Sequence, residues 1–403
     1  MKRIAIIGAG PIGLEAAIAA MDGGFEVEIF ERGKVADAVR QWGHVKMFSP
    51  FGMNSTARGR ERLERSGASL PESNELLTGA EFRERYLLSL ARSLPPDVLH
   101  EDTAVLAIGR SGVLKGDHIG ESVRGNTRFR MLTRNATGDE RVVNADVILD
   151  CTGTYTQPNG LGDGGIPAPG EGAARDRIFY GIPDFIGRDG KRFAGRRVLV
   201  VGAGHSGATA VTGLVELGSA ETHWLLRRDR ALPSEEIPDD PLPERSRLAA
   251  KSNRLVQEGR VTLHRAASIE SIANLNGALP VRIATPNDEY SLVIDEIIVA
   301  TGFRPDLMLA RELQVQTCWA TEGTYPLAAS LLGEAGADCL KTPAFGAEML
   351  MHPEPNYFTL GMKSYGRAPN FLLRTGHEQI ETVLDWLSEK ESSTITITSR
   401  STR

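Results

Sequence analysis

Short apolar runs alternate with helical patterns from the first residues of the chain. Residues 3–7 and 26–30 are strand-like runs rich in Ile and Val, and a helical run of small and apolar residues, 14–20, lies between them. The same order returns over residues 197–226. Strands that alternate with helices are typical of parallel sheets built from strand–helix–strand units. The pattern therefore predicts an α/β fold with two such units.

Other elements follow from the same kind of pattern. Thr78 with Glu81 three residues later predicts a capped helix that runs to about residue 94, before two prolines. A strand is expected over 98–108 and a late helix over 371–387.

A hairpin is predicted in the middle of the first half. Residues 128–133 and 141–150 are strand-like, and the polar segment 135–139 between them has the composition of a turn. The second strand ends in a Thr-Gly turn, and a similar Thr-Gly turn at 301–302 ends another strand. Both turns have a proline downstream, so we interpret them as crossings between two domains.

Both predicted units carry three glycines at the point where a strand turns into a helix. The two sets are Gly8, Gly10 and Gly13, and Gly202, Gly204 and Gly207. Such glycines allow a tight bend, a close approach of backbone to pyrophosphate, and close packing of helix on strand. One copy alone could be a glycine-rich turn without a ligand. Two copies in the same context indicate two bound dinucleotides.

The residue after each second strand distinguishes the two sites. Glu31 can accept hydrogen bonds from both ribose hydroxyls, so the first site suits an adenosine with a free 2′-hydroxyl. Arg227 and Arg228 match a 2′-phosphate instead, so the second site favours NADPH over NADH. For the two arginines, a solvated basic turn is the alternative.

The domain boundaries follow from these units. We predict a first FAD-type segment over 1–155, an inserted NADPH-binding domain over 156–310, a return over 311–391, and a flexible tail rich in Ser and Thr over 392–403. The fold class is thus two Rossmann-like domains of three layers, the second inserted in the first. Residues 232–243, with four prolines and four acidic residues, are expected to form a loop over the nucleotide or the substrate entrance, or else a plain surface loop.

Composition narrows the function. The 403 residues are 41% hydrophobic and 24% charged, which is ordinary for a globular enzyme, and the net charge of −6 argues against nucleic acid as a partner. No run reaches the ~18 apolar residues of a membrane span, so we expect a cytoplasmic protein. The three cysteines, Cys151, Cys318 and Cys339, form no C-x-x-C pair, so we expect neither a dithiol relay nor a metal site.

With these motifs the chain resembles the flavoproteins that have two dinucleotide-binding domains, and among them the class B flavin monooxygenases. The resemblance rests on GAGPIGLEAA with Glu31, RQWG at 40–43, MFSP at 47–50, CTGTYTQP at 151–158, GAGHSG with the arginines after it, and ATGFRP at 300–305. It implies FAD in the first site, NADPH in the second, and oxygenation of a small molecule at a nitrogen, sulfur or carbonyl carbon, with molecular oxygen as co-substrate.

The resemblance and the motifs together predict the residues that contact the cofactors. They are Gly8, Gly10, Pro11, Ile12, Gly13, Glu31, Arg32, Trp42, Thr152, Gly153, Gly202, Gly204, His205, Ser206, Gly207, Arg227, Arg228, Thr301, Gly302 and Gly361. His205 is expected beside the nicotinamide nucleotide, and Ser206 either donates to pyrophosphate or caps the helix.

Catalytic candidates are fewer, because the cofactor carries the chemistry. His44, Asn54 and Lys363 are our candidates for hydrogen bonds to the flavin or the substrate, and ordinary loop or capping roles are the alternative for the first two. Lys363 could also pair with an acidic substrate.

Two departures from the resembled families point in opposite directions. Reductase relatives usually have Gly-Asp where this chain has Gly361 and Met362, which favours the monooxygenases. The monooxygenases, however, typically carry F-x-G-x-x-x-H before the second fingerprint, and residues 170–185 contain no histidine. Because of this second departure, an NADPH-dependent flavin oxidoreductase without oxygen insertion is the first alternative, and a binding module switched by nucleotides is the second.

Overall fold

The computed structural model of this protein describes residues 1–275, 277–333 and 346–400. The chain divides into two compact units. The first contains Met1–Gly43, Pro50–Gln157 and the chain from Arg304 onward, and the second contains His44–Ser49 and Pro158–Phe303. The chain thus passes between the units just after each Thr-Gly turn, near the boundaries expected at 155/156 and 310/311.

The first unit is built around a parallel sheet of five strands in the order β16-β7-β1-β2-β3, with a separate antiparallel sheet β4-β5-β6. Its strands are β1 (Arg3–Ile7), β2 (Glu26–Phe30), β3 (Leu99–His100), β4 (Ala104–Arg110), β5 (Phe129–Arg134), β6 (Glu140–Ala145), β7 (Val147–Asp150) and β16 (Tyr357–Thr359). Its α-helices are α1 (Pro11–Asp22), α2 (Asp37–Gln41), α3 (Phe51–Asn54), α4 (Ala57–Arg65), α5 (Gly79–Phe82), α6 (Leu88–Arg92), α10 (Tyr325–Gly333), α11 (Met362–Tyr365) and α12 (Leu373–Arg400).

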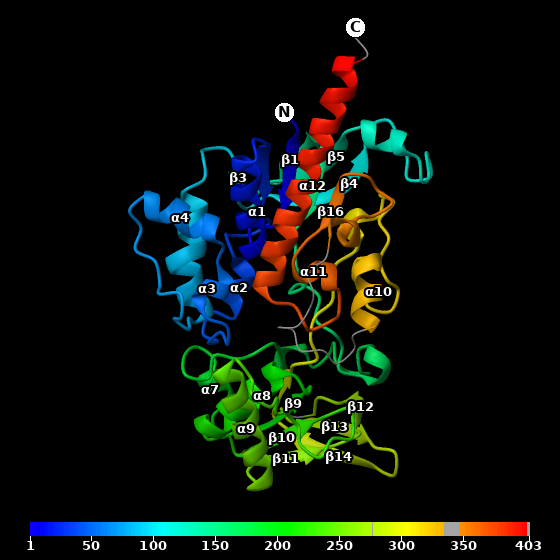
Figure 1. The fold of residues 1–403 in the computed structure, drawn as a ribbon. Coiled ribbons are helices and arrows are strands. Elements are labelled where there is room, and N and C mark those ends of the chain that lie inside the picture. Colours follow the sequence, from blue (N-terminus) through cyan, green and yellow to red (C-terminus); the bar gives the residue numbers. More distant parts are fainter. Residues whose placement is uncertain (276, 334–345, 401–403) are drawn as a thin grey trace. The chain divides into compact units, whose positions relative to one another are not determined.

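Alternate side chains of β1 face opposite layers, as a pleated strand requires. Ala5 and Ile7 pack with Phe129 and Met131 of the antiparallel sheet in one core cluster. On the helical side, α1 and α12 lie next to each other in the first unit (Figure 1). The unit therefore has three layers, and the predicted three-layer fold is confirmed.

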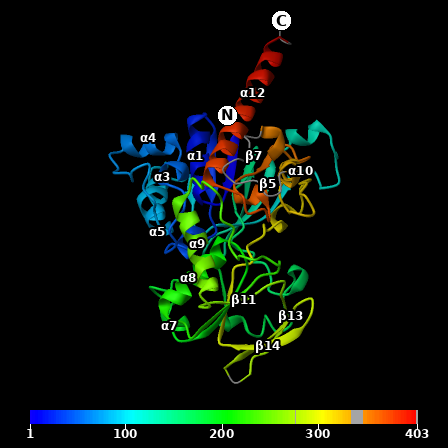
Figure 2. The same cartoon turned by 60° about the horizontal axis from the view of Figure 1, so that its bottom comes forward.

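The second unit repeats this plan with the parallel order β11-β10-β9-β15-β8 and the antiparallel sheet β12-β13-β14. Its strands are β8 (Ile178–Tyr180), β9 (Arg197–Val201), β10 (Glu221–Leu225), β11 (Thr262–His264), β12 (Ser268–Ile272), β13 (Leu279–Ala284), β14 (Glu289–Ile294) and β15 (Glu296–Val299). Its α-helices are α7 (Gly190–Phe193), α8 (His205–Leu217) and α9 (Pro243–Gln257), of which α8 and α9 lie side by side (Figure 2).

Most predicted elements have their expected places. The capped helix begins as expected, because Thr78 accepts from the backbone N–H of Glu81 and the Glu81 carboxylate accepts from the backbone N–H of Thr78. A π-helical segment, Arg83–Leu87, links α5 to α6 within it. The late helix α12 extends to Arg400, so it includes part of the segment from residue 392 that we expected to be flexible.

Two predicted strands are wrong in their extent. The segment 98–108 is split into β3 and β4 because Asp102 has a left-handed φ of 49° and the backbone N–H of Thr103 donates to the carbonyl of Glu31. The segment 141–150 is split into β6 and β7 at Asp146, whose carboxylate accepts from the backbone N–H of Arg3 at 2.9 Å. At the first break the chain passes from the parallel sheet to the antiparallel one, and at the second it passes back.

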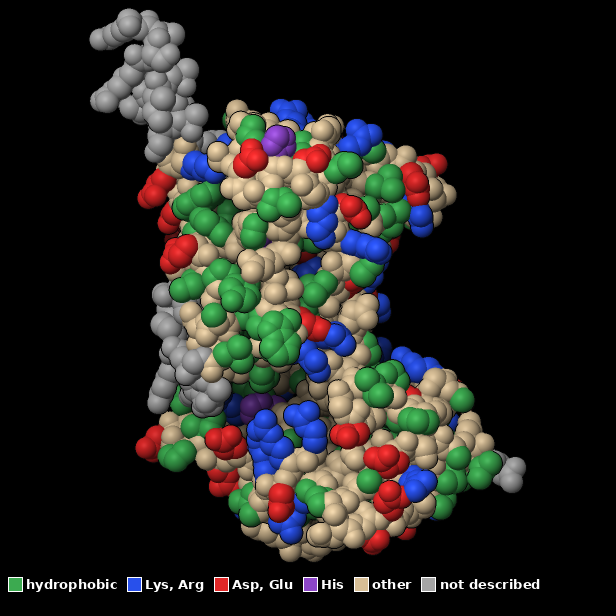
Figure 3. Space-filling model, turned by 90° about the vertical axis from the view of Figure 1, so that its right-hand side faces the viewer, with side chains coloured by type: hydrophobic (Ala, Val, Ile, Leu, Met, Phe, Trp, Pro, Cys, Tyr) green, Lys and Arg blue, Asp and Glu red, His purple; other side chains and the backbone are tan. Residues whose placement is uncertain are grey.

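Charged side chains of both signs lie on the surface, as the composition of the chain leads one to expect. Acidic and basic side chains are interspersed over the face shown in Figure 3. Within the described ranges, no helix combines the length and apolar character that a membrane crossing needs.

Candidate cofactor-binding sites

The first fingerprint forms a tight turn between β1 and α1. Gly8 has a φ of +100°, and a Cβ there would lie 2.7 Å from the carbonyl oxygen of Cys151. A Cβ on Gly13 would overlap the carbonyl oxygen of Gly8, whereas a Cβ on Gly10 would point into open space. Pro11 occupies the first turn of α1, where its missing N–H costs nothing. The turn thus leaves an open cradle in front of Gly10, at the start of a helix, as a pyrophosphate requires.

Glu31 closes the side of this cradle. Its Oε2 accepts from the backbone N–H of Ala9 at 2.8 Å, and its Oε1 accepts from that of Gly33 at 2.9 Å. Each oxygen keeps a further lone pair, so the carboxylate can still accept from two ribose hydroxyls.

These groups line one cavity of about 140 Å³ in the first unit. The predicted residues Gly8, Glu31, Arg32, Thr152 and Gly153 meet there, together with Lys363. Four further residues join them that could not be predicted from the sequence, because they come from the antiparallel sheet and the segment after residue 304. These are Ala104, Val105, Asp306 and Leu309.

A buried polar network lies behind the cavity, at the end of β7. The Oδ2 of Asp150 accepts from Tyr357 Oη at 2.6 Å and from Lys363 Nζ at 2.7 Å, and its Oδ1 accepts from Thr152 Oγ1 at 2.7 Å. Burial alone would raise the pKa of Asp150, but Lys363 and these hydrogen bonds outweigh it, and the pKa is lowered. Asp150 is therefore a fixed anion that holds the Lys363 ammonium beside the cradle.

Gly361 lies in the turn between β16 and α11 with a φ of +71°, and a Cβ there would lie 3.1 Å from Ile12 at the start of α1. Its N–H donates to Gln379 Oε1 at 2.8 Å, and Gln379 Nε2 donates to Ser364 Oγ at 2.9 Å. This turn, from a segment far along the chain, is thereby fixed next to the fingerprint helix.

Trp42 completes the predicted FAD residues of the first unit. Its indole stacks on Tyr155 with ring centroids 6.4 Å apart, and a Cβ on Gly79 would lie 2.5 Å from the indole. The buried Nε1–H has no hydrogen-bond partner among the described residues. A buried donor without a partner is costly, so this N–H is suited to a bound acceptor such as a flavin carbonyl. With the cradle at Gly10 and the Glu31 carboxylate, the residues fit FAD.

The predicted catalytic residues do not form one cluster within a unit. Asn54 is buried at the end of α3, and Lys363 is buried in its ion pair with Asp150. His44 groups with the second unit, and its buried Nε2 lacks a hydrogen-bond partner within the described part of the chain.

The second fingerprint repeats the geometry of the first. Gly202 has a φ of +125°, and a Cβ on it would overlap the backbone of Ala300. A Cβ on Gly204 would meet nothing within 4 Å, so the pyrophosphate cradle is open here as well. The Thr301–Gly302 turn beside it is held by Asn159, whose Nδ2 donates to the carbonyl of Thr301 at 3.0 Å.

Three of the predicted polar residues lie at the start of α8 and after β10. Burial and the nearby Arg245 lower the pKa of His205, against the opposing effect of Asp240, so the imidazole at the start of α8 is neutral. Its ring meets Phe48 edge-on at 5.4 Å. Arg227 and Arg228 follow β10 and are exposed, and neither guanidinium has a partner within the described ranges.

The proline-rich segment 232–243 folds against α9. The backbone N–H of Ser234 donates to Asn253 Oδ1 at 3.0 Å, and Asp240 forms a buried ion pair with Arg245 at 2.6 Å. Because both charges of this pair act on His205, the segment lies near the second fingerprint. This favours a loop over the nucleotide rather than a plain surface loop.

The two described cysteines are free. Burial raises the pKa of the Cys151 thiol far above its usual value, whereas a hydrogen bond from Thr321 lowers that of Cys318. Cys339 lies outside the described residues.

Two glycine cradles, one with a carboxylate and one with unpaired arginines, define a flavoprotein with two dinucleotide sites. Residues 125–328, just over half of the chain, match the family model described as pyridine nucleotide-disulphide oxidoreductase. The chain belongs to this family. It is an FAD- and NAD(P)H-dependent oxidoreductase, so the predicted flavoprotein class is confirmed. The family match does not support the second alternative, a binding module switched by nucleotides.

Solved structures support the fold at low sequence identity. Bacillithiol disulfide reductase from Bacillus cereus has a TM-score of 0.72 and 19% identity, with 96% of this chain and 99% of that chain covered. The same enzyme from Staphylococcus aureus gives 0.67 and 17%, with 97% and 99% covered. Ornithine N-hydroxylase from Kutzneria sp. 744, with reduced FAD, NADP⁺ and L-ornithine, gives 0.62 and 15%, with 97% and 100% covered. No curated protein matches the sequence significantly.

Proposed function

We propose that this protein uses NADPH to reduce bound FAD and then oxygenates a small molecule at a nitrogen, a sulfur or a carbonyl carbon, with molecular oxygen as co-substrate. The proposal goes beyond the family in two respects. The first is the choice of NADPH over NADH, and the second is the direct passage of electrons from the flavin to oxygen.

The choice of NADPH is supported by Arg227 and Arg228. Both are exposed directly after β10, where a carboxylate would otherwise bind the ribose. Guanidinium groups bind phosphate oxygens through charged hydrogen bonds, and neither of these two is committed to an acid within the described ranges. A 2′-phosphate at this position would therefore meet two available cations.

The proposal that electrons pass directly from the flavin to oxygen rests on one observation, the raised pKa of the Cys151 thiol. This cysteine lies against the FAD cradle, since a Cβ on Gly8 would meet its carbonyl oxygen. Desolvation raises the pKa of this half-buried residue's thiol, so the thiol stays protonated, whereas thiol–disulfide exchange needs a thiolate. The sequence also has no C-x-x-C pair. Oxygen is an acceptor that reacts with reduced flavin without help from a protein thiol.

When bound, FAD accepts a hydride from NADPH and passes two electrons to the acceptor. The chain's own groups bind and orient. Glu31 accepts from the ribose, the cradles at Gly10 and Gly204 take the pyrophosphates, and Lys363 supplies a fixed positive charge beside the first cradle. His44 and Asn54 stay candidates for hydrogen bonds to the substrate.

A reductase that inserts no oxygen is the second candidate. It is favoured by the absence of a histidine from residues 170–185, and the fold is similar to that of bacillithiol disulfide reductases. Such an enzyme would deliver electrons from FAD to a small acceptor without a cysteine relay in this chain.

The test follows the fate of oxygen. FAD-loaded protein is reduced anaerobically with NADPH or NADH, mixed with ¹⁸O₂, and assayed for reoxidation of the flavin, hydrogen peroxide and labelled product with panels of amines, sulfides and ketones. We expect faster bleaching with NADPH and one ¹⁸O atom in the product. Reoxidation that yields only hydrogen peroxide or a reduced acceptor would favour the reductase.

A variant without cysteines serves as the control. In the triple substitution Cys151→Ala, Cys318→Ala and Cys339→Ala, turnover with NADPH should stay within about threefold of the parent, because no thiolate takes part. A loss of a hundredfold or more, with FAD still bound, would contradict direct transfer from the flavin.

A further inference from the structure

The first unit contains a second cavity, of about 130 Å³, that none of the predicted cofactor contacts explains. Lys363 lines both this polar cavity and the FAD cavity, so one ammonium separates the two. A volume of this size corresponds to about four water molecules at ~30 Å³ each, or to one small polyatomic ion.

The inner wall of the polar cavity offers hydrogen-bond donors. Lys363 Nζ uses two of its three N–H groups, on Asp150 at 2.7 Å and on Thr152 at 2.9 Å, so one is left. Thr324 is 1% exposed, and its Oγ1 lacks a hydrogen-bond partner within the described ranges although the residue lines the cavity. A buried hydroxyl without a partner indicates a missing ligand or water.

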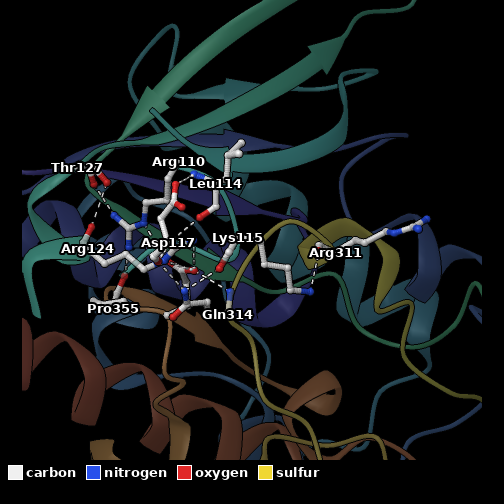
Figure 4. Close-up of polar contacts among 10 residues, drawn as sticks. Arg110, Leu114, Lys115, Asp117, Arg124, Thr127, Arg311, Gln314 and Pro355 are labelled. Atoms are coloured by element: carbon white, nitrogen blue, oxygen red, sulfur yellow. Dashed lines mark hydrogen bonds and ion pairs between the residues drawn. The ribbon is translucent and has the colours of Figure 1, made fainter. Parts of the chain in front are cut away.

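The mouth of the cavity is cationic. Lys115, from the long β4–β5 connection, and Arg311 both line it, and Lys115 Nζ donates to the carbonyl of Arg311 at 2.7 Å (Figure 4). The same figure shows Gln314 reaching the carbonyl of Lys115, at 2.7 Å. Lys115 is thus held against the backbone of Arg311, whose own side chain points away from Lys115 (Figure 4).

A buried ion network fixes the connection that carries Lys115. Arg110 Nε and Arg124 Nε donate to the Glu354 carboxylate at 2.7 and 3.0 Å, and all three side chains are fully buried. Arg124 Nη1 also donates to the carbonyl of Leu114 at 2.8 Å, the residue before Lys115 (Figure 4). Lys115 therefore extends from a rigid support rather than from a free loop.

Glu322 is the only carboxylate among the described residues that line this cavity, and it is already paired with Arg304. Because Lys363 is paired with Asp150, the charges that line the cavity without a counter-charge among the described residues are those of Lys115 and Arg311, and both are positive. We infer that the polar cavity binds a small oxyanion, a phosphate or a carboxylate, between Lys115 and Arg311 at the mouth and Thr324 and Lys363 inside. This site shares Lys363 with the FAD cavity but does not depend on which acceptor the flavin reduces.

The test uses FAD-loaded protein in a phosphate-free buffer at constant ionic strength. Orthophosphate or acetate replaces chloride stepwise while the midpoint of thermal unfolding is recorded, since a ligand of the folded state raises the midpoint with concentration. We expect saturable stabilisation, and the ion with the lower half-saturating concentration identifies phosphate or carboxylate as the better ligand. In Thr324→Val and Lys115→Met, half-saturation should need about tenfold more ion.

Matched controls separate this site from others. Thr212→Val removes another buried hydroxyl without a partner in the described residues, in α8 of the second unit, and Lys191→Met removes an exposed cation of α7. Neither should change half-saturation. The inference fails if no saturable effect exists or if the controls behave like Thr324→Val. It also fails if a parallel titration of the apoprotein shows stabilisation that the FAD-loaded protein lacks, since the cavity would then belong to the flavin site. Loss of the effect in Arg227→Glu would assign it to the second dinucleotide site instead and would also overturn the inference.

Discussion

At the scale of single residues, Arg227 carries the choice of nicotinamide nucleotide. Reversing its charge in Arg227→Glu should raise the KM for NADPH more than tenfold, because a charged hydrogen bond to phosphate contributes ~1.5–3 kcal/mol and a tenfold change corresponds to ~1.4 kcal/mol. The KM for NADH should change by less than about threefold, since NADH lacks the 2′-phosphate. Steady-state kinetics with both nucleotides measures the difference.

Arg196→Glu is the matched control for this charge reversal. Arg196 is exposed and directly precedes β9, at the end of the strand opposite to the Gly202 turn. The same change of net charge there should leave both KM values unaltered. Equal effects of the two variants would mean that Arg227 acts through the general field of the protein and not through a phosphate contact.

Lys363 is the second residue whose replacement has a predicted effect, in this case on stability. In Lys363→Met the Asp150 carboxylate stays buried without its cation, and removing one partner of a buried pair typically costs ~3–5 kcal/mol. In the parent, the pKa of Asp150 is lowered, so the stabilisation is present above the ordinary pKa of aspartate and is lost as the pH falls through the lower, folded value.

The variant should reverse this dependence. Without Lys363, burial is opposed only by hydrogen bonds, so the pKa of Asp150 rises and the deficit in unfolding free energy should be largest at neutral pH and shrink on acidification. Urea unfolding of the parent and the variant at pH 7.5 and 5 measures this deficit. Lys34→Met, which removes an exposed partner of Asp102, should show little loss at either pH. A deficit for Lys363→Met that does not vary with pH would contradict the ion pair.

At the scale of elements, α12 acts on the FAD site through Gln379. In Gln379→Leu the N–H of Gly361 loses its acceptor and Ser364 loses a donor, so the turn beside the fingerprint helix is released. We expect FAD to bind about tenfold more weakly, as titration of the apoprotein would show. Gln379→Glu keeps an acceptor for Gly361 and should recover most of the affinity. A loss of stability without weaker FAD binding would limit Gln379 to a structural role.

The same elements show what the sequence could predict. The turns at Gly8 and Gly202 could be read because their chemistry lies within a few consecutive residues. The break between β3 and β4 could not, since it depends on hydrogen bonds from residues 102 and 103 to the loop after β2. Lys363 was singled out from its neighbourhood, but its partner Asp150 is 213 residues away, and nothing local in either segment signals the pairing.

At the scale of the whole molecule, buried histidines make the fold sensitive to acid. Burial lowers the pKa of His352 and His377 in the first unit, and of His264 in the second, to about 4. In the unfolded chain these groups titrate near 6.5, so unfolding takes up protons as the pH falls below that value. Each histidine can therefore remove up to ~1.4 kcal/mol of stability per pH unit between 6.5 and 4.

One buried carboxyl opposes this trend. Burial raises the pKa of Glu15, whose hydrogen bonds to Thr56 and Tyr86 only partly offset it, so protonation of Glu15 favours the folded state on acidification. One such carboxyl against three histidines leaves a net loss of stability, so the free energy of unfolding should fall steadily from pH 7 to 5.

Replacing His352 or His377 with Gln should make the free energy of unfolding depend less steeply on pH, by about the contribution of one histidine. His118→Gln, at an exposed position, should not change this dependence. Because the histidines lie in both units, calorimetry should show every unfolding transition moving to lower temperature at pH 5. A transition that stays fixed would mean that the histidines of its unit are already protonated in the folded state.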